Sequence, residues 1–93
     1  MENKLSKTVK LLENFMSELE VEGICGFWVD EEPDVHDFIW VYIILDLDWL
    51  ENNQHPTKPG FVVQRMRSGV ENEIKKFLNI DVRVGSVAKR CSE

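Results

Sequence analysis

The chain of 93 residues carries 17 acidic and 11 basic side chains, for a net charge of −6, and its hydrophobic fraction is 43%. This length and composition predict one folded domain over residues 1–93 and exclude a disordered chain, a collagen-like repeat and a multidomain enzyme. The acidic balance argues against general binding to nucleic acid or to an anionic membrane surface.

The first predicted element is an amphipathic helix over residues 3–20, with Gly23 expected just beyond its end. Residues 21–29 have the composition of a β-strand, and residues 38–49 form the clearest strand of the chain. The Pro- and Asp-rich residues 30–37 predict a turn, which makes the two strands an antiparallel hairpin. Apolar side chains recur along the helix at three- and four-residue steps: Leu5, Val9, Leu12, Phe15, Met16 and Leu19.

The second half of the chain continues this alternation of elements. Residues 51–60 are polar, with two prolines and a glycine, and predict a loop. Residues 61–78 predict a second amphipathic helix that ends at Asn79, with Gly69 permitting a close packing contact. Residues 80–88 alternate as a third strand.

The order α-β-β-α-β predicts an α+β fold in one two-layer domain. A right-handed crossover joins the second and third strands, so the three-stranded sheet should be mixed, with both helices on one face. The strand over residues 38–49 is expected at the centre of the sheet, because it is apolar on both faces.

This order of elements is similar to that of type II KH-like domains and of some small ribosome-assembly factors. The similarity covers the whole chain and rests on element order alone. The glycine-rich GxxG loop that clamps nucleotides in KH domains is absent from this sequence, so no residue role is carried over from them.

Strand alternation places a large apolar patch on the sheet face away from the helices. With a turn centred near residue 34, Trp28 lies opposite Trp40, Gly26 opposite Tyr42 and Glu22 opposite Asp46. A monomer rarely exposes such a patch, and Trp and Tyr are enriched at protein interfaces. The alternative is a different face assignment or a covering segment of the chain itself. The predicted interface consists of Ile24, Trp28, Phe38, Trp40, Tyr42 and Ile44.

Two other clusters suggest chemistry. Glu22, Asp46 and Asp48 are candidate ligands for a divalent cation through carboxylate oxygens, although solvated acids paired with Arg83 or Lys89 explain them more simply. Basic side chains of the second helix are candidate phosphate contacts, and the aromatic sheet face is a candidate platform for RNA bases. These basic side chains are Arg65, Lys75 and Lys76.

The compartment is predicted from the cysteines. Only Cys25 and Cys91 are present, whereas small secreted scaffolds carry more, so free thiols in the cytoplasm are expected. The longest apolar run, residues 38–45, is far shorter than the roughly 20 residues of a membrane helix. No signal peptide is recognised at the N-terminus.

These observations predict a non-enzymatic interaction or assembly module that needs no cofactor. The expected partner is a second copy of the chain in a homodimer packed sheet to sheet, with another protein as the alternative partner. Nucleic acid and membrane are not expected partners. The alternative functions are an RNA-binding module and, behind it, a hydrolase or transferase that uses the carboxylates.

Overall fold

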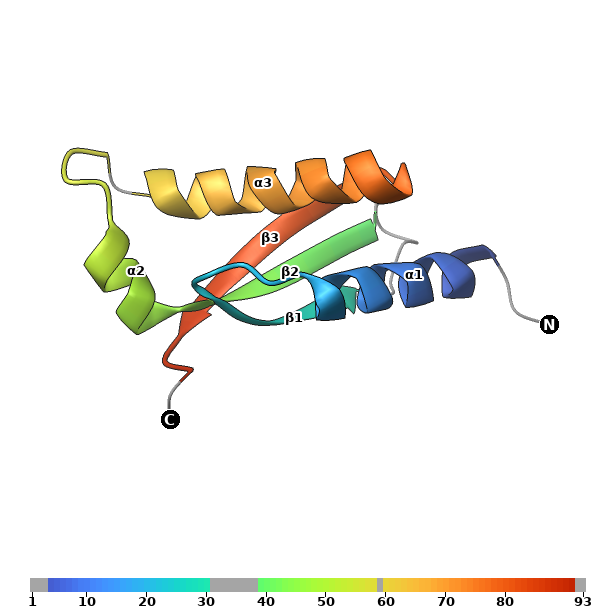
Figure 1. Cartoon of the computed structure of the whole chain (residues 1–93), viewed down its shortest axis with the longest axis horizontal. Coiled ribbons are helices and arrows are strands. Elements are labelled where there is room, and N and C mark those ends of the chain that lie inside the picture. The colour runs from blue at the N-terminus through green and yellow to red at the C-terminus, as the bar shows by residue number, and fades with distance from the viewer. Residues whose placement is uncertain (1–3, 31–38, 59, 92–93) are drawn as a thin grey trace.

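The computed structural model describes residues 4–30, 39–58 and 60–91. Figure 1 shows the elements in chain order: α1 (Lys4–Glu18), β1 (Ile24–Asp30), β2 (Ile39–Asp46), α2 (Leu47–Asn53), α3 (Phe61–Leu78) and β3 (Val82–Lys89). The predicted α+β architecture is confirmed, and α2 is an addition to it. Phe38 and all of the predicted turn after Asp30 lie outside the described residues.

The three strands form one sheet in the spatial order β1-β2-β3. β2 runs antiparallel to β1 and parallel to β3, so the sheet is mixed and β2 is its central strand, as predicted. A parallel pair needs a long crossover between its strands, and the segment containing α2 and α3 provides it.

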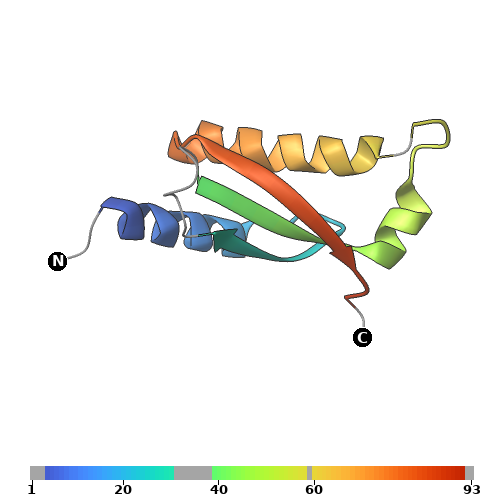
Figure 2. The ribbon, with the colours of Figure 1, turned by 180° about the vertical axis from the view of Figure 1, so that it is seen from behind.

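Both long helices cover the same face of the sheet. Val41, Ile43 and Leu45 of β2 point to this face and are at most 1% exposed. Figure 2 shows the opposite side, where the strands lie in front of α1 and α3 and no described helix covers them. The core between the layers consists of Leu12, Met16, Val41, Ile43, Leu45, Leu50, Val70, Ile74, Val82 and Val84.

The helix α2 replaces the end of the predicted second strand. β2 stops at Asp46, whose carboxylate oxygen accepts a hydrogen bond from the backbone N–H of Asp48 at 3.2 Å and so caps the new helix. Leu50 is then buried in the core, and Trp49 packs beside it. Alternating apolar residues at 45, 47 and 49 suggested a longer strand, but a short apolar run of this kind also fits a helix.

Trp49 explains the glycine that follows α1. Gly23 has φ 91°, a conformation that L-residues rarely adopt, and a Cβ at this position would lie 2.5 Å from Cε3 of Trp49. The backbone carbonyl of Gly23 also accepts a hydrogen bond from the Asp46 N–H at 2.8 Å. The turn before β1 is therefore fixed to the start of α2.

The helix α3 spans the predicted residues and ends as expected. Asn79 follows it with φ 55°, and its N–H donates to the carbonyl of Lys75 at 3.0 Å. The expected packing contact at Gly69 is wrong, because this glycine is exposed and a Cβ there would meet nothing within 4 Å. Among the described residues, none of the helices is both long enough and apolar enough to cross a membrane.

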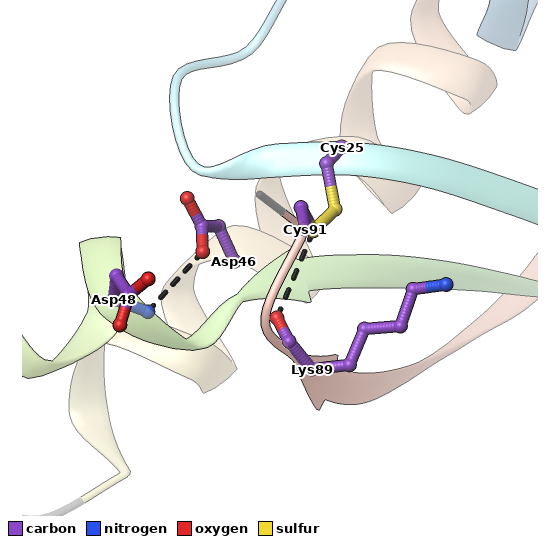
Figure 3. Close-up of a disulfide and its surroundings, with 5 residues drawn as sticks. All are labelled: Cys25, Asp46, Asp48, Lys89 and Cys91. Carbon is purple, nitrogen blue, oxygen red and sulfur yellow. Dashed lines mark hydrogen bonds between the residues drawn. A yellow bond between two sulfur atoms is a disulfide. The ribbon is translucent and has the colours of Figure 1, made fainter. Parts of the chain in front are cut away.

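Cys25 and Cys91 form a disulfide, so the prediction of two free thiols is wrong. Figure 3 shows the bond between β1 and the segment after β3. Ile24 and Ala88 both pair with Leu45, so the start of β1 and the end of β3 meet at one end of the sheet. The two cysteines are 66 residues apart in sequence, and their Cα atoms are 6.4 Å apart in space, a normal separation for a disulfide.

Replacing Cys25 with serine is expected to lower the free energy of unfolding by roughly 4 kcal/mol, because the disulfide closes a long loop in the unfolded chain. Urea unfolding followed by circular dichroism measures this loss. Cys91→Ser should give the same loss, and the double variant should lose nothing more. Single variants as stable as the oxidised wild type would contradict the prediction.

Candidate functional site

We call the sheet face opposite α1 and α3 the open face. Side chains from all three strands make an apolar cluster on it, the open-face patch. The ladder places Trp28 opposite Tyr42, and Ile44 opposite Val87. Trp28 and Val87 are 42% and 43% exposed, so the patch reaches solvent within the described part of the chain. The open-face patch consists of Trp28, Trp40, Tyr42, Ile44 and Val87.

Three rings of this patch stack on one another. The ring centroids of Trp28 and Tyr42 are 4.8 Å apart with planes at 15°, and those of Trp40 and Tyr42 are 5.8 Å apart at 16°. Stacked aromatic pairs of this kind contribute about 0.5–1.5 kcal/mol beyond the area they bury. Each tryptophan therefore turns one ring face toward Tyr42.

Gly85 of β3 provides the space for the central ring. A Cβ at this position would lie 2.6 Å from Cε1 of Tyr42, so the ring rests against the β3 backbone. The predicted register placed Gly26 opposite Tyr42, but Gly26 pairs with Ile44. The parallel register of β2 and β3 was needed to identify Gly85, and no turn in the sequence fixes that register.

The strand register corrects the predicted interface in part. Trp28 lies opposite Tyr42 rather than Trp40, a shift of two residues that leaves every side chain on its predicted face. The bulge between Ile24 and Gly26 is the exception, because it places Ile24 opposite Leu45 on the helix-covered face. Ile24 therefore does not belong to the patch, whereas Val87, which was not among the predicted interface residues, does.

The three predicted metal ligands are not arranged as a metal site. Glu22 is exposed in the turn before β1. Asp46 caps α2, and Asp48 lies in its first turn, as Figure 3 shows. Asp48 Oδ1 accepts a hydrogen bond from Arg90 Nη1 at 2.7 Å, rather than from Arg83 or Lys89. Among the described residues, no three His, Cys, Asp or Glu side chains gather around a common point where a metal ion could bind.

The predicted phosphate contacts are also separated. Arg65 and Lys75 are ten residues apart on α3, which is about 15 Å along a helix. Lys75 Nζ forms an ion pair with Asp81 at 2.9 Å, and Lys76 Nζ lies 5.2 Å from the ring centroid of Phe77. The three cations therefore do not form a single phosphate-binding cluster.

Comparison with protein-family models, with curated proteins and with solved structures finds no match to this chain. A function must therefore be inferred from the geometry of the molecule itself. The open-face patch is the feature that unites side chains from every strand of the sheet.

Replacing Gly85 with alanine is expected to displace the Tyr42 ring and lower the free energy of unfolding by about 1–3 kcal/mol, because the added methyl overlaps the ring. Tryptophan fluorescence should change as the stack opens, and urea unfolding measures the loss. Gly69→Ala is the matched control, and in an open helical position it should stabilise the protein by about 0.5–1 kcal/mol. Equal effects of the two substitutions would contradict the packing described for Tyr42.

Replacing Asp46 with alanine is expected to cost about 1 kcal/mol of stability, because α2 loses its N-cap. Asp46→Asn keeps a capping oxygen and should be close to neutral. Thermal unfolding of both variants, with and without added manganese, checks this capping role. If manganese strongly stabilised the wild type but neither variant, the result would instead support the predicted cation site.

Proposed function

We propose that this protein is an interaction or assembly module that associates with a second copy of itself through the open face. The observation that supports this is the open-face patch, on a sheet face without a covering helix in the described chain. Antiparallel sheets that face water usually carry polar residues on that side, and contiguous apolar surface on a monomer marks an interaction site.

The charges on the open face favour a second copy as the partner. Asp30 of β1 and Asp46 of β2 are acidic, whereas Arg83 and Lys89 of β3 are basic. Asp30 and Arg83 both lie level with Trp40. A two-fold axis parallel to β2 would therefore place Asp30 of one copy over Arg83 of the other, whereas the two Asp46 carboxylates would face each other. Complementary margins of this kind fix the register of an interface more than they raise its affinity.

The size of the open face predicts a weak dimer. Three strands about 4.8 Å apart and eight residues with a rise of about 3.3 Å give a planar area of about 380 Å². Stable protein complexes bury about 800 Å² on each partner. Association should therefore depend on concentration, with the monomer as a folded species in its own right.

Single-stranded RNA is the second candidate partner, because aromatic rings lie beside the cations of β3. Bases bind such proteins by stacking on free ring faces. Stacking on Tyr42 occupies one ring face of Trp28 and one of Trp40, and Asp30 and Asp46 on the same side of the sheet repel phosphates. The arrangement therefore favours a protein partner over RNA. Asp46 caps a helix and Asp48 contacts Arg90, so we propose no hydrolase or transferase activity.

Replacing Val87 with lysine is expected to weaken self-association at least about tenfold, because a charge is placed inside the apolar patch that forms the proposed interface. Sedimentation of wild type and variant up to about 100 μM measures the dissociation constants. Leu11→Lys is the matched control: it changes a similarly exposed apolar residue on α1 and should leave the dimer intact.

Circular dichroism should show that both lysine variants remain folded, because each changes an exposed side chain. A wild-type protein that stays monomeric at about 100 μM would overturn the proposal. A monomer whose tryptophan fluorescence changes only with single-stranded RNA would favour the second candidate instead.

The cytoplasmic location was predicted from free thiols, and the Cys25–Cys91 bond removes that basis for it. The cytoplasm keeps most thiols reduced, whereas an oxidising compartment would keep this bond closed. Alkylation of thiols at the moment of lysis, followed by mass measurement, distinguishes the two states. A fully oxidised pair would argue for an oxidising compartment.

A further inference from the structure

The outer edge of β1 is open to a further strand. β1 is the first strand of the sheet, and in the described part of the chain it pairs with β2 alone. Natural edge strands are protected by charges, prolines or bulges. β1 has a bulge at its start and Asp30 at its end, but residues 26–29 between them have no such protection. The other edge strand, β3, carries Arg83 and Lys89.

A groove runs beside this open edge, between β1 and α1. Two adjoining hollows of about 240 and about 500 Å³ make it up, and they share Ser17 and Phe27 in their walls. Together they follow β1 from Ile24 to Val29, which is the length of a short extended peptide. Figure 1 shows α1 lying alongside β1, so the helix forms the second wall.

The lining of the groove suits an added strand. Main-chain hydrogen bonds to a sheet edge provide affinity for an extended peptide, and hollows for alternate side chains provide specificity. Phe27 gives the groove an apolar contact, whereas Glu13 and Asn14 of α1 make its outer wall polar. Side chains of a new strand that point toward α1 would enter this space.

The charge around the groove selects the kind of peptide. Glu13 lines the groove, and Glu18, Glu20 and Glu22 are exposed between the end of α1 and the start of β1. Lys7 lies in the first half of α1, and Lys10 lies one turn before Asn14, so one cation adjoins the end of the groove that contains Glu13. The same acidic surroundings disfavour a second β1 in this position, because two copies would bring like charges together.

We propose that the groove between α1 and the open edge of β1 binds an extended basic peptide of a partner protein as a fourth strand. This site uses the backbone edge of β1, whereas self-association uses side chains of the open face. The two sites are therefore separate, and binding of the peptide does not depend on the dimer.

A capped pentapeptide of alternating lysine and valine tests the proposal by NMR titration of the isotope-labelled Val87→Lys protein. The amide signals of residues 26–29 and 13–17 should shift. The same peptide built with glutamate in place of lysine should bind at least about tenfold more weakly. A version with methylated backbone nitrogens should also bind more weakly, because it cannot donate to the edge.

Glu13→Lys is the informative variant, because this exposed side chain lies on the groove wall. It should weaken binding of the lysine peptide about two- to fivefold and strengthen binding of the glutamate peptide, whereas Glu73→Lys on α3 should change neither. Shifts on the open face alone, or no shifts, would overturn the proposal. Shifts of residues 26–29 that grow with protein concentration in the absence of peptide would overturn it in favour of β1–β1 pairing.

Discussion

The central strand β2 is apolar on both faces, and the rest of the molecule is arranged around that constraint. Val41, Ile43 and Leu45 on one face are covered by α1 and α3 and are essentially inaccessible to water. Trp40, Tyr42 and Ile44 on the other face have no helix above them in the described chain. The flanking strands reduce this exposure, because Trp28 of β1 stacks on the Tyr42 ring and the same ring packs against Gly85 of β3. The exposure that remains is the physical reason to infer a partner.

Periodicity in the sequence was sufficient to predict the layers but not the local geometry. The apolar stripe of residues 61–78 predicted α3 to the residue, and the two-sided apolarity of residues 38–45 placed β2 at the centre. Most of the predicted patch was correct although the predicted register was wrong. The register error was two residues, and a shift by an even number leaves each side chain on the same face of its strand. Ile24 was misplaced because a bulge at Cys25 changes the alternation, and single-sequence patterns do not reveal bulges.

The disulfide and α2 depend on contacts between distant parts of the chain. β1 is antiparallel to β2 and β3 is parallel to it, so the start of β1 and the end of β3 lie at the same end of the sheet. Cys25 and Cys91 become neighbours only because of this arrangement. The helix α2 is stabilised by the packing of Trp49 against Gly23 and by the burial of Leu50 in the core. Local composition around residues 46–50 fits either a strand or a helix, so tertiary packing decides between them.

β1 connects the two proposed binding surfaces, because it contributes a side chain to one and its backbone edge to the other. Trp28 projects onto the open face, whereas the unpaired edge of residues 26–29 faces the groove beside α1. The bulge and the disulfide at Cys25 hold the start of β1 against the rest of the sheet, so a fourth strand would extend an edge that is already ordered. Binding would then require little ordering of the β1 backbone, so most of the loss of conformational entropy would come from the peptide. A rigid acceptor edge of this kind makes strand addition feasible even for a short segment.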